Sequence, residues 1–253
     1  MKDKFKIING IKYNYLRQWQ QGALEKTFNE QYSIINAMTG SGKSSLTIAK
    51  IYSELLSDIS KKAIIVVPQE IITTGFIKEN IILLDETYFT WHLSERNILI
   101  GNTLLNKGAL LMDFLTSEGI GSPSDRTILT SHLGLVLLMD KIEISAFDNI
   151  SFYIDEAHHI SSLFEKENKL GVFIKNIINR NKSAITLTTA TFYRGDKIPI
   201  LTEEQKQIFV RYDLPVDQYM ESLNYLRDIK IEIILYDTND PMSVLAKDIQ
   251  KYG

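Results

Sequence analysis

A glycine-rich loop with the sequence AMTGSGKS, residues 37–44, constrains the fold of this chain more than any other feature. The apolar run Tyr32–Ala37 before it is typical of a buried strand, and apolar residues after it follow the i, i+3, i+4, i+7 spacing of a helix. A strand that leads through glycines into a helix points several backbone N–H groups at one place, where phosphate oxygens are stabilised. A flexible linker with an incidental lysine would need neither flanking element. The loop therefore predicts a phosphate-binding P-loop.

Individual residues of this loop suit distinct parts of a nucleotide. Gly40 and Gly42 allow a tight turn because no Cβ stands in the way. Lys43 would reach the β- and γ-phosphates, and the Ser44 hydroxyl would bind Mg²⁺. We therefore expect the nucleotide to contact the loop and the start of the helix, namely Thr39, Gly40, Ser41, Gly42, Lys43, Ser44 and Ser45.

A second motif, Asp155-Glu156-Ala157-His158, directly follows the apolar run SFYI. In open α/β sheets, ligand-binding groups lie at the carboxyl ends of the strands. Asp155 would hold Mg²⁺ through its water shell, and Glu156 suits the orientation and deprotonation of an attacking water. Acidic clusters also occur at helix starts, where they favour the helix dipole. The preceding strand and the upstream P-loop favour the catalytic interpretation, with Lys43, Asp155 and Glu156 as catalytic residues.

Short apolar runs alternate with longer helical patterns along the chain, as in βαβ units around a parallel sheet. The sequence therefore predicts an α/β fold with a mostly parallel sheet and helices on both faces. The expected strands are Tyr32–Ala37, Ala63–Val67, Asn97–Ile100, Thr127–Ser131, Ser151–Ile154 and Ala184–Thr188, with a more peripheral strand at Ile231–Leu235. The expected helices cover residues 15–29, the segment after the P-loop, Thr103–Leu115 and Leu133–Lys141.

Composition narrows the class of protein further. The 253 residues are 44% hydrophobic, which is enough for one large domain or two small ones. No apolar stretch approaches the roughly 20 residues that span a bilayer, and the first ten residues lack a signal core. The absence of cysteine excludes disulfides and thiolate metal sites. We expect a cytoplasmic protein. Because the net charge is −3, any nucleic-acid contact must come from a local surface or from a part of the protein outside this sequence.

Three motifs in order, AMTGSGKS, IDEAH and a later TAT, resemble motifs I, II and III of superfamily 2 DEAD/DEAH-box helicases. The match covers about residues 15–236 and implies a RecA-like P-loop NTPase domain, the first of two such lobes. The stretch TTATFYRGD is similar to the branch that contains type III restriction subunits and phage or repair translocases. RQWQ, residues 17–20, resembles the adenine-reading element before motif I, with Gln20 as the base-contacting glutamine.

The resemblance implies an ATPase that uses ATP and Mg²⁺, with Ser44 and Asp155 as the metal-binding residues. Such an ATPase moves on nucleic acid, and DNA is favoured over RNA as that nucleic acid. His158, Thr189 and Thr191 would couple the γ-phosphate state to the second lobe. Phosphates of the nucleic acid would contact a few hydroxyls and one cation, with Thr73, Thr130, Ser131 and Arg194 as the candidates. Proline is frequent in the family where Phe192 stands. The remaining histidines His92, His132 and His159 are interpreted as packing or surface residues.

Residues 1–236 are expected to form the lobe, with 237–253 as a linker toward a second RecA-like lobe in the same or a partner chain. That lobe would supply arginine fingers, so the chain alone should bind ATP weakly and hydrolyse it slowly. Two alternatives remain open from the residues. One is a DNA-packaging motor, which also pairs a P-loop with an acidic strand end. The other is a regulatory or scaffold module that binds nucleotide without turnover.

Overall fold

A computed structural model of the chain describes residues 7–8, 11–12, 16–68, 74–82, 88–101, 106–159, 169–190 and 202–222. Most of these residues belong to one compact unit, Met1–Tyr219, and the second unit, Met220–Gly253, is described only at Met220–Ser222. The expected strand at Ile231–Leu235, the expected boundary at residue 236 and the linker 237–253 lie outside the described residues.

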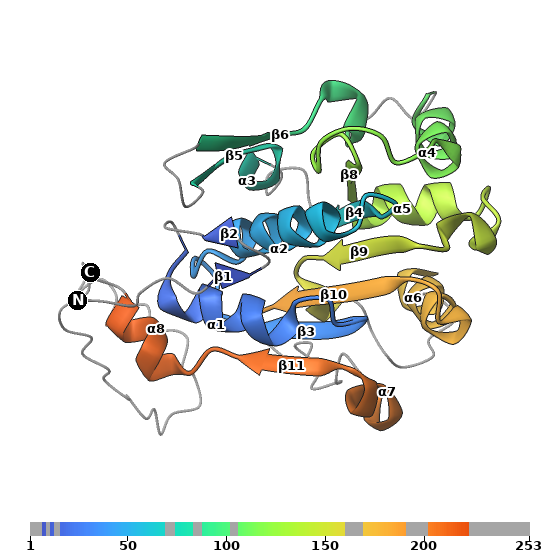
Figure 1. The fold of residues 1–253 in the computed structure, drawn as a ribbon. Coiled ribbons are helices and arrows are strands. Elements are labelled where there is room, and N and C mark those ends of the chain that lie inside the picture. Colours follow the sequence, from blue (N-terminus) through green and yellow to red (C-terminus); the bar gives the residue numbers. More distant parts are fainter. Residues whose placement is uncertain are drawn as a thin grey trace, which may run out of the picture. The chain divides into compact units, whose positions relative to one another are not determined.

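A seven-stranded sheet organises the first unit (Figure 1). Its strands are β3 (Tyr32–Asn36), β4 (Lys62–Val67), β7 (Ile98–Leu99), β8 (Thr127–Ser131), β9 (Ile150–Ile154), β10 (Ala184–Thr189) and β11 (Val210–Asp213). The spatial order is β11-β3-β10-β9-β4-β8-β7, and every neighbouring pair is parallel. The carboxyl ends of β3, β9 and β10, where the predicted motifs begin, therefore lie side by side at one edge of the sheet.

Helices pack on both faces of this sheet, because successive strand residues point to opposite sides. One face buries Ile64, Val66 and Phe152 against α4 (Lys107–Thr116), α5 (His132–Met139) and α6 (Lys169–Arg180). The other face buries Ile65 and Tyr153 against α1 (Gln18–Thr27) and α2 (Lys43–Ser57). The central strands β4 and β9 are buried along their whole length, as expected of a sheet that is covered on both sides.

Smaller elements complete the described part of the chain. The strands β5 (Lys78–Ile82) and β6 (Tyr88–His92) form an antiparallel hairpin after the short helix α3 (Thr74–Ile77), and β1 (Ile7–Ile8) pairs with β2 (Ile11–Lys12). Two short helices, α7 (Glu203–Ile208) and α8 (Val216–Ser222), flank β11. Single turns of 3₁₀ helix occur at Glu95–Asn97, Ile144–Phe147 and Ala157–His159.

The predicted α/β class with a mostly parallel sheet and helices on both faces is confirmed. Six of the seven strands of the main sheet lie where the sequence predicts them, within one or two residues at each end. The described helices α1, α2, α4 and α5 also correspond to predicted helices, although α1 begins at Gln18 rather than at residue 15. In the described residues, none of the helices is long and apolar enough to cross a membrane.

Candidate nucleotide-binding site

The loop between β3 and α2 has the backbone geometry that its glycines predict. Gly40 and Gly42 have φ angles of 77° and 98°, in the left-handed region that favours glycine. Gly42 is also the residue before the first turn of α2, and a Cβ placed on it would lie 2.7 Å from Gln20 Nε2. The amino end of this 15-residue helix therefore meets the tight turn, which is the arrangement that stabilises phosphate.

Lys43 lies at the centre of the site and is buried. Its Nζ atom donates to the carbonyl of Ala37 at 3.0 Å and to that of Met38 at 3.4 Å. The same ammonium group lies 3.6 Å from Glu156 Oε1. The P-loop lysine and the second acidic residue of the DEAH motif, far apart in sequence, are thus in direct electrostatic contact.

Gln20 and Arg17 brace the P-loop from the start of α1. Gln20 Nε2 donates to the Gly42 carbonyl at 2.8 Å, while its Oε1 accepts the Arg17 backbone N–H at 2.6 Å. The Arg17 guanidinium donates to the Ser41 carbonyl at 2.9 Å. The predicted adenine contact of Gln20 stays a prediction, and both polar atoms of its side-chain amide are bonded to protein backbone in this structure. Arg17 is a site residue that the sequence analysis does not single out.

Asp155 stands at the carboxyl end of β9 and is buried. Its backbone N–H donates to the Val66 carbonyl at 2.8 Å, and its Oδ1 accepts the Thr188 hydroxyl at 2.7 Å. Burial raises the pKa of this carboxyl, and the nearby Glu156 charge raises it further, while the Thr188 hydroxyl and Lys43 oppose the increase. Thr188, which the sequence analysis does not name as a site residue, therefore contacts the acidic pair directly.

Glu156 has a left-handed backbone with φ of 49°, which is unusual for a residue with a side chain. Such strain costs about 1–3 kcal/mol and persists only where surrounding contacts impose it. Its Oε2 lies 3.2 Å from His158 Nδ1, and the same ring nitrogen lies 3.4 Å from Thr189 Oγ1. His158 and Thr189, predicted as coupling residues, are therefore adjacent. Thr191 lies outside the described residues.

The hydroxyl of Ser41 in the loop is relevant to phosphate binding. Ser41 Oγ is buried and makes no hydrogen bond within the described part of the chain. A buried polar atom of this kind needs a partner, because desolvation without one is costly. Ser45 Oγ donates to Glu79 Oε2 at 3.0 Å, which connects α2 to β5 of the hairpin. The unpaired hydroxyl, the glycine turn and Lys43 fit a phosphate group.

The predicted nucleic-acid contacts are less well supported by position. The Thr130 side chain is buried and its hydroxyl points to the Leu99 carbonyl at 3.5 Å, so its placement favours a structural role. Ser131 caps α5, where its hydroxyl accepts the Gly134 N–H at 3.0 Å. Thr73 and Arg194 lie outside the described residues.

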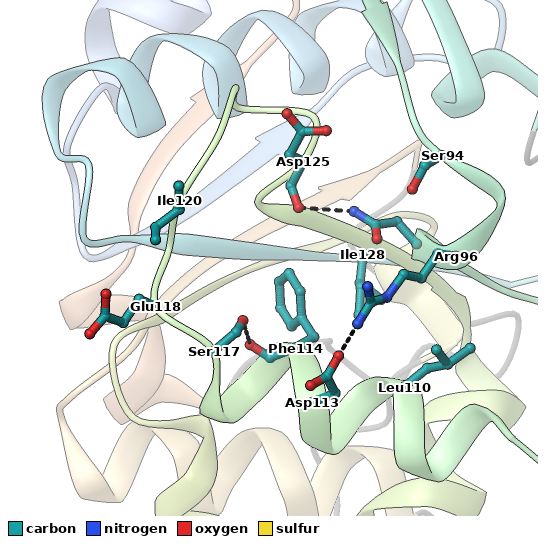
Figure 2. Close-up of a pocket in the computed structure, with 11 residues that line it drawn as sticks. Ser94, Arg96, Leu110, Asp113, Phe114, Ser117, Glu118, Ile120, Asp125 and Ile128 are labelled. Atoms are coloured by element: carbon teal, nitrogen blue, oxygen red, sulfur yellow. Dashed lines mark hydrogen bonds and ion pairs between the residues drawn. The ribbon is translucent and has the colours of Figure 1, made fainter.

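Figure 2 shows a separate pocket of about 350 Å³ between α4, the start of β7 and the loop before β8. Arg96 and Asp113 form an ion pair across it, and the Asp125 carbonyl accepts a hydrogen bond from Asn97 at 3.0 Å. These residues lie at the amino ends of β7 and β8, the edge opposite to the P-loop. Ligands of parallel sheets usually bind at the carboxyl ends, and this pocket contains none of the predicted site residues. Among the described residues, no group of three or more acidic or histidine side chains could hold a metal ion.

A parallel sheet with a P-loop after one strand and a DEAH motif two strands away defines a helicase-like P-loop ATPase domain. Residues 14–194 match the family described as type III restriction enzyme, res subunit. The match spans more than half of the chain, and the chain belongs to this family. The resemblance predicted from the sequence is thereby confirmed, and the family implies the use of ATP.

A curated relative extends this similarity. The chain is 28% identical over 222 residues to YeeB of Bacillus subtilis (strain 168), which carries a provisional name as an ATP-dependent helicase. The alignment covers 87% of this chain but only 35% of YeeB, so the chain spans about a third of that relative.

Two solved structures are similar in fold. The UvsW helicase of bacteriophage T4 matches with a TM-score of 0.49 and 17% identity over 83% of this chain and 64% of UvsW. The SWI2/SNF2 ATPase core of Sulfolobus solfataricus, solved in complex with double-stranded DNA, matches with a TM-score of 0.46 and 14% identity over 83% of this chain and 47% of that core.

Proposed function

We propose that this chain is the ATP-binding lobe of a nucleic-acid-dependent ATPase, a helicase or a double-stranded DNA translocase. One observation carries the proposal: Lys43, Asp155 and Glu156 converge at the carboxyl ends of β3 and β9, with the Lys43 ammonium 3.6 Å from the Glu156 carboxylate. This edge is where parallel sheets bind ligands. A lysine and two carboxylates at that edge suit phosphoryl transfer.

The residues of this chain then divide the chemistry among them. Thr39–Ser45 hold the triphosphate through backbone N–H groups, and Gln20 contacts the adenine. Lys43 neutralises charge on the β- and γ-phosphates, and Glu156 orients and deprotonates the attacking water. Ser44 and Asp155 would hold Mg²⁺, which would supply positive charge against the phosphate oxygens.

The coupling and binding roles belong to the same proposal. His158, Thr189 and Thr191 transmit the state of the γ-phosphate toward a second RecA-like lobe. Residues 1–236 form the first lobe and 237–253 lead toward the second, in the same or a partner chain. The family's connection with restriction enzymes favours DNA over RNA as the nucleic acid. A cytoplasmic location suits an enzyme that acts on DNA with ATP.

Substitution of Glu156→Gln tests the proposal, because it removes the base and keeps the shape of the side chain. We expect the variant to bind a fluorescent ATP analogue about as well as the wild type and to lose at least about 100-fold in ATP hydrolysis, since general-base catalysis contributes roughly 10²–10⁴-fold. Lys43→Ala should instead weaken binding as well. Unchanged hydrolysis by the Glu156→Gln variant would reject the enzyme interpretation and favour a nucleotide-binding scaffold.

A further inference from the structure

His132, the first residue of α5, contacts the acidic turn of the site. Its Nε2 atom lies 3.0 Å from the Asp155 backbone carbonyl. A carbonyl oxygen can only accept a hydrogen bond, so Nε2 carries the proton and donates it. The sequence alone suggests a packing or surface role for this histidine, because nothing in its spacing connects it with Asp155.

This contact joins the ends of two strands that are not neighbours in the sheet. His132 is the first residue of α5, directly after β8, whereas Asp155 follows β9, and β4 lies between these two strands. From β4, the Val66 carbonyl accepts the Asp155 backbone N–H at 2.8 Å. The backbone of Asp155 is therefore held at its N–H by β4 and at its carbonyl by the first residue of α5, and both of these elements precede it in the sequence.

The carbonyl that His132 binds belongs to the peptide unit that joins Asp155 to Glu156. The orientation of this unit sets the direction in which the Glu156 backbone continues. Glu156 leaves it with φ of 49°, a conformation that a residue with a side chain adopts only when its surroundings impose it. The hydrogen bond from His132 is one of the contacts that can impose it.

We propose that His132 is a positioning residue for ATP hydrolysis, which orients the Asp155–Glu156 peptide so that the Glu156 carboxylate faces Lys43. The proposal rests on the proposed function, in which Glu156 is the base. His132 itself contacts neither nucleotide nor metal in this role. Because it starts α5, it also connects the end of β8 to the acidic turn.

A purely structural role in holding α5 is less consistent with the other contacts of that helix. Ser131 already caps α5 through the Gly134 N–H at 3.0 Å. Leu135 and Leu138 anchor the helix in the core on one face of the sheet. The helix is therefore fixed at its amino end and along its buried face without the bond to Asp155.

Single-turnover ATP hydrolysis by the whole chain, with protein in excess over ATP, tests this role. His132→Ala removes the donor, whereas His132→Gln places an amide N–H at similar reach. We expect His132→Ala to hydrolyse ATP about 10- to 100-fold more slowly, the effect of a misplaced catalytic group. Its dissociation constant for a fluorescent ATP analogue should stay within about twofold of the wild type, and His132→Gln should recover most of the rate. Leu133→Ala, an exposed change on the same helical turn, should alter neither quantity.

The outcomes separate this inference from the proposed function. If the wild-type protein hydrolyses ATP no faster than the Glu156→Gln variant, the proposed function is rejected, and the positioning role is rejected with it. If the wild type hydrolyses ATP and His132→Ala does so at the same rate, the positioning role is rejected while the ATPase stands. If His132→Ala lowers the rate, the nucleotide affinity and the melting temperature together, and His132→Gln restores none of them, the histidine contributes to stability alone.

Discussion

Three residues with left-handed backbone lie around the site, and they differ in what they require from their neighbours. Gly40 and Gly42 adopt φ of 77° and 98° without a Cβ to clash, so the turn of the P-loop carries little backbone strain. Glu156 adopts φ of 49° with a full side chain. Its conformation depends on Lys43, His158 and the backbone contacts of Asp155, which explains why a sequence pattern identifies the residue but not its geometry.

Substitution of Gly42→Ala should weaken nucleotide binding, and a second glycine offers a matched control. A Cβ on Gly42 would lie 2.7 Å from Gln20 Nε2, whereas a Cβ on Gly101, at nearly the same φ of 97°, has nothing within 4 Å. Both changes should lower the free energy of unfolding by about 1 kcal/mol or somewhat more, because alanine disfavours this conformation. Only Gly42→Ala should displace Gln20 and weaken binding of an ATP analogue, measured by fluorescence titration. Equal affinity in the two variants would contradict this steric argument.

Thr188 is the residue whose loss should most directly affect Asp155. Its hydroxyl donates to Asp155 Oδ1 at 2.7 Å, and a buried hydrogen bond to a charged group contributes about 1.5–3 kcal/mol. Thr188→Val keeps the shape of the side chain but removes the donor. We expect a melting temperature several degrees lower and a higher Mg²⁺ concentration for half-maximal ATP hydrolysis, because burial then raises the pKa of Asp155 with less opposition.

Thr186→Val is the control for this change, since Thr186 lies on the same strand and bonds Ser33 Oγ at 3.0 Å instead of Asp155. It should lower stability by a smaller amount, because both partners are neutral, and leave the Mg²⁺ dependence unchanged. An identical Mg²⁺ shift in both valine variants would mean that the effect comes from general loosening of β10.

At the scale of elements, the sequence predicts best the strands that are buried on both faces. The runs around Ile64 and Phe152 are continuously apolar, as expected of central parallel strands, and the motifs that follow them identify the carboxyl edge. β11, with the sequence VRYD, escapes prediction because it is a four-residue edge strand with alternating polar residues. The β5–β6 hairpin is not predicted either, because the polar residues Lys78, Glu79 and Asn80 occupy the first three positions of β5.

The helix α6 could have been predicted and was not among the expected elements. Leu170, Phe173, Ile174 and Ile177 follow helical spacing and are all buried against the sheet. The contacts of Thr188 and His132 could not have been found in this way. They depend on which strands are neighbours, on the register of β10 against β9 and on the crossing over β4, and a single sequence does not specify strand order.

An ion pair at the end of α6 should make the stability of this element depend on pH. Arg180 donates to both oxygens of Asp148, at 2.8 and 2.7 Å, and this hydrogen bonding holds the pKa of Asp148 below its ordinary value of 3.8. A lowered pKa of a carboxyl stabilises the folded state above the ordinary value, and this contribution disappears as the pH falls through the folded-state pKa. Asp148→Asn should therefore lower the unfolding free energy by about 1 kcal/mol at neutral pH, as for a well-formed pair near the surface.

Denaturant unfolding at pH 7 and at successively lower pH measures this difference, which should shrink toward zero in the acid range. Asp140→Asn is the matched control, because the pair between Asp140 and Lys169 is about half exposed on both sides, at 51% and 55%. Exposed pairs contribute little, so this variant should resemble the wild type throughout. A constant deficit of Asp148→Asn at all pH values would show that packing, and not charge, is responsible.

At the scale of the whole molecule, the two buried faces of the sheet stabilise the lobe, and the carboxyl edge of the sheet carries the residues proposed for catalysis. Two cations at that edge already have partners: Lys43 contacts Glu156 and two carbonyls, and Arg17 donates to the Ser41 carbonyl at 2.9 Å. An additional cation at the γ-phosphate accelerates phosphoryl transfer about 10³–10⁵-fold in P-loop GTPases, where the same chain or a partner protein supplies it. The lobe binds the nucleotide in our proposal but depends on a second lobe for fast turnover.

We therefore expect this chain alone to bind ATP·Mg²⁺ weakly and to hydrolyse it far below one turnover per second, compared with about 1–100 per second for complete phosphotransferases. Duplex DNA, single-stranded DNA and RNA should each leave this rate within about twofold, since stimulation requires two lobes that close on the nucleotide together. The measurement is steady-state phosphate release with each nucleic acid at saturating ATP, with Glu156→Gln as the blank. Brisk turnover by the chain alone, stimulated by one of these nucleic acids, would contradict the requirement for a second lobe and would identify the nucleic acid on which the protein acts.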